Sequence, residues 1–173
     1  MSAPTGSNGV LSRPSVVFDC NVYLQATVQD FGPAFACLQS FLTGGFSLFV
    51  SPRILSEIES VFSRPELRRK FRRLTEETTD ALLETLVTQG ILVYPVPPVF
   101  AYERDPDDAH YVNLAAAAGA RYLVSRDRDL LDLMDENRAE ARDFRQRFPD
   151  LTILDPVEFL KILPGAPPLV STS

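Results

Sequence analysis

The alternation of short apolar runs with helical segments is the feature that most constrains the fold of this chain. Five runs have the length and the β-branched or aromatic content of buried strands, and segments with helical spacing of apolar residues separate them. The runs span residues 15–18, 46–50, 91–94, 121–124 and 151–154. Repeated strand-then-helix units predict a parallel sheet. We therefore expect an α/β fold of three layers, with a central five-stranded parallel β-sheet flanked by helices on both faces.

Capping residues predict where several helices begin. Ser51 followed by Pro52 is typical of an N-cap with proline at the first helical position. Asp105 followed by Pro106 has the same pattern, so Asp105 is an N-cap candidate that supports the next helix start. For the short helix after the fourth apolar run, we expect Asp129 as the cap.

The length and composition suit one domain of an ordinary globular protein. The 173 residues can enclose one core, which we assign to residues 15–163. Residues 1–14 are expected to be a flexible N-terminal extension without the apolar core of a signal peptide, and residues 164–173 a flexible tail. No apolar run has the length of a membrane span. Two cysteines form neither a disulfide framework nor a four-sulfur zinc site, and we expect a cytoplasmic protein.

Four acidic residues stand out because each lies at or beyond the end of a predicted strand. The four are Asp19 directly after the first run, Glu57 on the helix after the second, Asp108 at a helix start after the third, and Asp127 just past the fourth. Ligand sites of open parallel sheets form outside the carboxyl ends of the strands. Carboxylates gathered there repel one another unless a cation lies between them. The pattern predicts a Mg²⁺ or Mn²⁺ site for phosphodiester chemistry.

A purely structural explanation remains open for some of these acids. Asp108 is also a favourable first-turn acid of its helix, and an aspartate at 127 or 129 can serve as a helix cap. Asp127 and Asp129, two residues apart beyond a strand, can instead face one cation. The single histidine, His110, has no nucleophile-elbow motif near it, which argues against a Ser-His-Asp hydrolase and for carboxylate chemistry.

The distribution of basic residues points to a second functional segment. The net charge of −6 is unfavourable for a nucleic-acid binder. Between residues 64 and 73, however, six of ten residues are basic: Arg64, Arg68, Arg69, Lys70, Arg72 and Arg73. This segment can follow an RNA backbone, or it is a solvated helix face.

Four segments in order resemble the PIN domain family. They read VVFDCNVYLQA, SPRILSEIESVFSRPEL, RDPDDAHYVNLAAAAGARYLVSRDRDLLDL and LTILDPVEFL. The resemblance covers about residues 15–163, and it extends to the bacterial branch related to the VapC toxins of toxin–antitoxin pairs. It implies a five-stranded parallel sheet between helices and Mg²⁺- or Mn²⁺-dependent hydrolysis of single-stranded RNA. It also implies a homodimer and, for toxin members, a cognate antitoxin.

The resemblance assigns the acidic positions of the family to five residues of this chain: Asp19, Glu57, Asp108, Asp127 and, as a frequent fifth acid, Asp129. Asn21 and Ser125 match polar positions that orient the metal ligands. Cys20 stands where many relatives have Thr, so one hydroxyl group is missing near the site. Residues 135–148 form a longer link than usual, which can cover the site, form a dimer contact or lie on the surface.

Other acidic α/β domains fit the sequence less well. A phosphatase of the haloacid-dehalogenase type needs a second Asp two residues after the first, and that position is Asn21. A response-regulator receiver needs paired acids and a late lysine, and neither arrangement is evident. The remaining alternative is a catalytically weak PIN-like module that binds RNA or a partner protein.

Overall fold

The computed structural model describes residues 13–165, so the predicted N-terminal extension and C-terminal tail lie almost wholly outside the described residues. Five strands pair in parallel in one sheet, in the order β3-β2-β1-β4-β5. They are β1 (Ser15–Phe18), β2 (Ser47–Val50), β3 (Ile91–Leu92), β4 (Tyr122–Val124) and β5 (Thr152–Leu154). The prediction of a five-stranded parallel sheet is confirmed, although β3 is shorter than the apolar run that predicted it.

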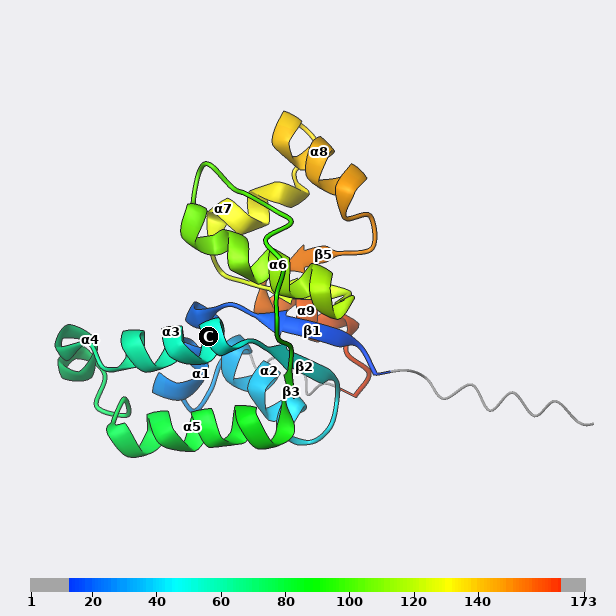
Figure 1. The fold of residues 1–173 in the computed structure, drawn as a ribbon. Helices are drawn as coiled ribbons and strands as arrows, with labels where there is room; N and C mark the ends of the chain where they lie inside the picture. Colours follow the sequence, from blue (N-terminus) through cyan, green and yellow to red (C-terminus); the bar gives the residue numbers. More distant parts are fainter. Residues whose placement is uncertain (1–12, 166–173) are drawn as a thin grey trace, which may run out of the picture.

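Helices cover both faces of the sheet (Figure 1). In chain order they are α1 (Cys20–Val28), α2 (Pro33–Leu42), α3 (Pro52–Phe62), α4 (Pro65–Lys70), α5 (Glu76–Gln89), the 3₁₀ turn η1 (Pro106–Asp108), α6 (Ala109–Ala118), α7 (Arg128–Leu131), the 3₁₀ turn η2 (Asp132–Met134), α8 (Ala139–Arg147) and α9 (Pro156–Ile162). On one face α6 packs against β1, β2 and β4, and on the other α1, α2, α3, α5 and α9 pack against one another. Between residues 13 and 165, no helix combines the length and the apolar character needed to cross a membrane.

The strand order makes the chain change direction between two central strands. From β1 the chain moves outward to β2 and β3, and then returns across the sheet through α6 to β4 and β5. Phe18 is aligned with Val124, and the backbone N–H of Asp19 donates to the carbonyl of Val124 at 3.1 Å. The carboxyl ends of β1 and β4 therefore lie side by side, at the kind of switch point where α/β folds bind ligands.

Two aromatic clusters fill the interior. Around the sheet, the ring of Phe18 lies 5.5 Å from that of Tyr23 and 5.6 Å from that of Phe46, with Phe159 nearby. A second cluster joins Phe100 to Tyr102, Phe144 and Phe148 at centroid distances of 5.5–5.9 Å. Aromatic pairs in these tilted and edge-to-face arrangements stabilise a core beyond the area that they bury. The second cluster ties the segment after β3 to α8.

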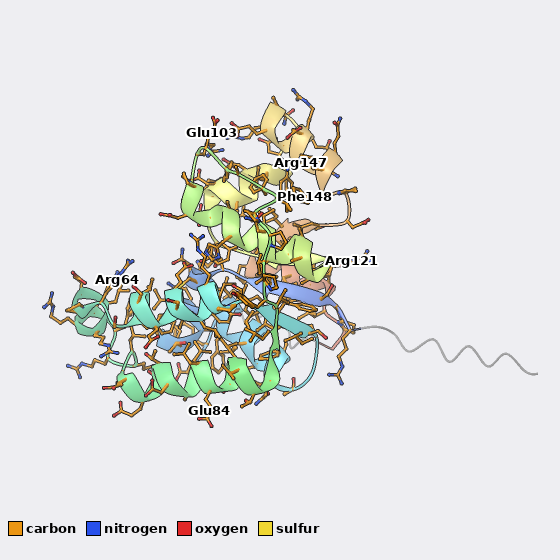
Figure 2. The ribbon with its side chains drawn as sticks, in the orientation of Figure 1. Arg64, Glu84, Glu103, Arg121, Arg147 and Phe148 are labelled. Carbon is orange, nitrogen blue, oxygen red and sulfur yellow. The ribbon has the colours of Figure 1, made fainter. Side chains whose placement is uncertain are left out.

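The long link between β4 and β5 anchors the chain segment that leads to η1. Its helix α8 buries Ala141 and Phe144, and Arg147 donates to the carbonyl of Val99 at 2.6 Å while its guanidinium lies over the rings of Phe100 and Phe148. Figure 2 shows Arg147 beside Phe148 on this side of the molecule. Residues 135–148 are therefore packed into the fold and do more than decorate its surface.

The helix caps were predicted with one error. Ser51 accepts from the N–H of Ile54 at 3.2 Å, and Asp105 caps η1 by accepting from the N–H of Asp107 at 3.2 Å, as expected. The expectation of Asp129 as the cap of α7 is wrong. Asp127 is the cap and accepts from the N–H of Asp129 at 2.8 Å, because Asp127 still has the extended backbone that an N-cap needs, whereas Asp129 already lies within the helix.

Candidate metal centre

One cavity at the carboxyl ends of β1 and β4 brings together the four acids that follow the strands. Its volume is about 210 Å³. The residues that line it are Asp19, Cys20, Asn21, Glu57, Val61, Arg64, Asp108, Tyr111 and Asp127. We call it the acidic cavity. A larger cavity of about 580 Å³ lies at the amino ends of β1 and β4. Its lining is different and includes Arg13, Arg121 and Asp150.

Asp19 is the most buried of the four acids, with 2% of its surface exposed. Its Oδ1 atom accepts from the N–H of Val22 at 2.9 Å at the start of α1, and its Oδ2 atom accepts from the hydroxyl of Ser125. Burial raises the pKa of Asp19 to about 6, although these hydrogen bonds favour the charged form. The Asp19 carboxylate is thus held in one orientation and is costly to ionise without a cation.

Ser125 connects the two central strand ends. Its hydroxyl donates to Asp19 and accepts from the N–H of Asp127 at 2.9 Å, and the side chain is fully buried. Asn21 also lines the acidic cavity, with an exposed side chain. The geometry of Ser125 is that of a residue that orients an acidic ligand, which is the role that its sequence position implies.

A cluster of three carboxylates fits a divalent cation. Asp105, Asp108 and Asp127 each have a carboxylate oxygen within 4.8 Å of those of the other two. The Oδ2 atom of Asp108 is buried and has no hydrogen-bond partner within residues 13–165. Burial and the neighbouring charges of Asp127, Asp105 and Asp19 raise the pKa of Asp108 to about 8. A hard cation with oxygen ligands, such as Mg²⁺ or Mn²⁺, satisfies this oxygen and offsets the repulsion.

Glu57 lies at the wall of the acidic cavity and is held by two side chains of α6. Its Oε2 atom is 2.7 Å from Nε2 of His110, and its Oε1 atom accepts from the hydroxyl of Tyr111. The Tyr111 oxygen in turn accepts from the N–H of Cys20 at 3.1 Å. Partial burial opposes ionisation of Glu57, but the hydrogen bonds from His110 and Tyr111 outweigh it and lower the pKa of Glu57.

Sequence reasoning missed the partners of Glu57. The sequence points to His110 only as a possible hydrolase base, and it gives Tyr111 no role. A signal was present, because Tyr111 lies three residues after Asp108, and residues with that spacing lie on the same side of a helix. Asp105, expected only to support the helix start, also belongs to the three-carboxylate cluster.

Asp129 lies apart from the acidic cavity. It forms an ion pair with Arg104, which also contacts Asp132 at 3.1 Å, and it is not among the residues that line the cavity. A metal-ligand role for Asp129 remains a prediction that this geometry does not favour.

The basic segment divides into residues with and without partners in the protein. Arg68 donates to the carbonyl of Phe62 at 2.9 Å, and Arg73 forms an exposed ion pair with Asp30 at 2.6 Å. For the other four, no ion pair forms within the part of the chain that the structure describes: Arg64, Arg69, Lys70 and Arg72. Arg64 stands at the junction of α3 and α4 (Figure 2) and lines the acidic cavity. Arg64 is therefore the residue of the segment that the structure places beside the acids.

Comparison with known proteins gives one family match. The sequence model of a family described as PIN domain matches residues 15–129, more than half of the chain. The matched residues run from β1 into α7 and include every acid that lines the acidic cavity. No curated protein matches the chain.

Proposed function

The chain belongs to the PIN domain family, and on that premise we propose that it is a metal-dependent endoribonuclease. Its proposed reaction is hydrolysis of phosphodiester bonds in single-stranded RNA with Mg²⁺ or Mn²⁺. Nuclease activity is what PIN domains generally have, and the carboxylate cluster can hold a metal. Two observations on Asp108 carry the proposal: its Oδ2 atom is buried with no partner in the described range, and one of its carboxylate oxygens lies within 4.8 Å of those of Asp105 and Asp127.

The acids have separate roles in this proposal. Asp19, held by Ser125, is the central ligand, and Asp108 and Asp127 complete the set, with Asp105 beside them. A divalent ion held by these residues would polarise a phosphoryl oxygen and lower the pKa of a water molecule. Neutralisation by the ion keeps these buried carboxylates charged at neutral pH, despite the raised pKa values of Asp19 and Asp108.

Glu57 and Arg64 act on the reacting groups. The lowered pKa of Glu57 keeps it ionised, and with His110 and Tyr111 fixing its orientation it accepts a hydrogen bond from the attacking water. That water attacks phosphorus, the bond to the 3′-oxygen breaks, and the products carry a 3′-hydroxyl and a 5′-phosphate. Arg64, at the edge of the acidic cavity, binds a phosphate of the strand.

Cleavage of end-labelled single-stranded RNA tests the proposal. The purified chain is incubated with Mn²⁺, with Mg²⁺ or with EDTA, beside the Asp19→Asn variant. We expect cutting that requires metal and falls by about 100-fold or more in Asp19→Asn, since one ligand charge is lost while the shape is kept. Asp143→Asn is the matched control, because Asp143 is an exposed residue of α8 and its loss should leave cleavage unchanged.

Two results would contradict the nuclease. Full activity in Asp19→Asn would show that the acidic cavity takes no part in the cleavage. No cutting of several RNAs, with metal still bound in calorimetry, would leave a PIN-like module that binds RNA or a partner protein without turnover.

We also propose, on the family resemblance, that the chain forms a homodimer and acts as the toxin of a type II toxin–antitoxin pair. Sedimentation of the purified chain measures whether it is a dimer. For the second, a small reading frame directly upstream should encode a protein that binds the chain and suppresses the cleavage described above. Failure of that neighbour to bind or inhibit would separate nuclease activity from toxin function.

A further inference from the structure

Two hollows lead away from the acidic cavity, and the farther one has the chemistry of a nucleotide site. A connecting hollow of about 390 Å³ shares Glu57, Val61 and Arg64 with the acidic cavity. It also shares Arg53 with a third hollow of about 340 Å³. The third hollow is lined chiefly by Arg53, Tyr94, Val96, Pro98, His110 and Asn113, and we call it the Tyr94 hollow. A strand leaving the acidic cavity can follow this path over one side of the molecule.

The Tyr94 hollow combines an exposed aromatic ring with an unpaired cation. Tyr94 follows the edge strand β3 and is 78% exposed. Arg53, on the first turn of α3, is exposed and forms no ion pair with any residue of the described part of the chain. No Asp or Glu is among the residues that line this hollow. Aromatic rings that stack on bases, beside cations that neutralise phosphates, are what proteins use to hold single strands.

His110 lies between the Tyr94 hollow and the acidic cavity. It is 7% exposed, and its ring lines the Tyr94 hollow. Its Nε2 atom is engaged by Glu57, whereas its Nδ1 atom is buried with no hydrogen-bond partner within residues 13–165. A buried nitrogen without a partner costs free energy. Because Nδ1 is buried, a base in the hollow reaches it only if the ring moves, so in this structure His110 contributes the surface of its ring to the hollow.

The charges along the path favour RNA over a protein partner. The connecting hollow carries Arg53, shared with the Tyr94 hollow, and Arg64, shared with the acidic cavity, and its lining also contains Glu57 and Asp107. One arginine at the acidic cavity and one at the Tyr94 hollow can each neutralise a phosphate of a strand that spans the two. The volume of the Tyr94 hollow is within the range of small-ligand sites.

We propose that the Tyr94 hollow binds a nucleotide of the substrate strand that flanks the scissile phosphate. The base stacks on Tyr94, its phosphate contacts Arg53, and His110 joins this site to Glu57 in the acidic cavity. The proposal rests on single-stranded RNA as the substrate, and it adds a base-binding site outside the acidic cavity. Truncated RNAs that end before this site are bound more weakly.

Fluorescence of 2-aminopurine tests the site without requiring cleavage. The fluorescent base is placed at each position in turn of a short single-stranded RNA, and each RNA is mixed with the full-length Asp19→Asn chain in Mg²⁺. We expect quenching at one position, because stacking on an aromatic ring quenches this base. Tyr94→Ala should remove the quenching and raise the dissociation constant about tenfold. Tyr94→Phe should keep the quenching and leave the dissociation constant unchanged.

Two further variants separate stacking from general effects. Phe31→Ala is the matched control, since Phe31 is 68% exposed and does not line the Tyr94 hollow. It should leave quenching and affinity unchanged. Arg53→Gln should weaken binding and lower the slope of log affinity against log salt by about 1, while Arg53→Lys should restore that slope.

The outcomes distinguish this site from the nuclease itself. Absent quenching, or equal quenching in Tyr94→Ala, overturns the site even if the wild-type chain cleaves RNA. Position-specific quenching that depends on Tyr94 supports the site even if no cleavage is found. If Tyr94→Ala instead dissociates a dimer in sedimentation and quenching is absent, the hollow binds a second copy of the chain and the proposal is overturned.

Discussion

The Nε2 atom of His110 lies 2.7 Å from the Oε2 atom of Glu57, so a residue of α6 fixes the acid that α3 contributes to the acidic cavity. Tyr111, the next residue of α6, donates to the other oxygen of the same carboxylate. Because α6 follows directly on η1, which contains Asp108, one segment both supplies an acid and orients another. The position of Glu57 therefore depends on the seating of α6 against the sheet.

Replacing Tyr111 by Phe should reduce both stability and turnover. The change leaves Glu57 with one hydrogen bond fewer and the N–H of Cys20 without its acceptor, and we expect a loss of about 1–3 kcal/mol in the free energy of unfolding. The kcat for RNA cleavage should fall about tenfold with little change in KM, as for residues that orient a reacting group. Urea unfolding and steady-state cleavage measure the two effects.

Tyr23→Phe is the matched control for that variant. The Tyr23 hydroxyl is buried and finds no hydrogen-bond partner in the described range, so its removal should leave stability unchanged or increase it. If Tyr111→Phe and Tyr23→Phe lost the same free energy of unfolding and the same kcat, the hydrogen bonds of the Tyr111 hydroxyl would contribute to neither quantity.

Without metal, the protein should lose stability as the pH rises. Burial raises the pKa of Asp19 to about 6, and burial with neighbouring charges raises that of Asp108 to about 8, from an ordinary value of 3.8. The native state then binds more protons than the unfolded chain, so stability falls between about pH 4 and pH 8. Thermal unfolding in EDTA across this range measures the fall.

Divalent metal should reverse that loss. At pH 8, Mg²⁺ or Mn²⁺ should raise the unfolding midpoint, since the ion binds the native carboxylates and not the unfolded chain. Asp108→Asn should flatten the pH dependence in EDTA. A midpoint that rises with pH in EDTA would contradict the burial of uncompensated acids.

Arg104→Gln should weaken metal binding more than it weakens the fold. Arg104 precedes Asp105 and pairs with Asp129 and Asp132, so it fixes the segment that enters the three-carboxylate cluster. We expect the apparent Mn²⁺ affinity to fall about threefold to tenfold in calorimetry, with little change in the unfolding midpoint, because exposed ion pairs contribute little stability. Arg145→Gln, which removes an exposed pair with Glu136 on the outer side of α8, should change neither quantity.

Phe144→Ala should be strongly destabilising. Phe144 is 1% exposed and packs on Phe100 and Phe148, so its truncation leaves a cavity that costs about 3–5 kcal/mol. Urea unfolding should show this loss, whereas Phe31→Ala, at an exposed position, should change the free energy of unfolding by about 0.5 kcal/mol or less. A small effect of Phe144→Ala would mean that α8 is dispensable to the core.

The sheet was predictable because its signals are local. Each strand is a short apolar run, each helix has its own periodicity and several have caps such as Ser51, and the parallel pairing follows from their alternation. The gathering of Asp19, Asp108 and Asp127 was predictable for the same reason, since the carboxyl ends of parallel strands meet at one edge.

What escaped prediction depends on how helices are rotated and where they begin. The three-residue turn η1 brings Asp105 next to Asp108 and Asp127, and the seating of α6 turns His110 and Tyr111 towards Glu57. The ion pair of Asp129 with Arg104 was not predictable either, because it depends on how the start of α7 directs the side chain. Such orientations are decided by tertiary packing, which single-sequence patterns do not contain.

The bond between Ser125 and Asp19 joins residues 106 positions apart, and it dictates when the acidic cavity can be completed during synthesis. A growing chain on the ribosome has made β1, β2 and β3 before it makes β4. Until β4 is made, Asp19 has neither Ser125 nor Asp127 beside it. Translation must pass residue 127 and β4 must dock before the acids meet. The unfinished chain therefore lacks a complete acidic cavity until β4 has been made and has docked.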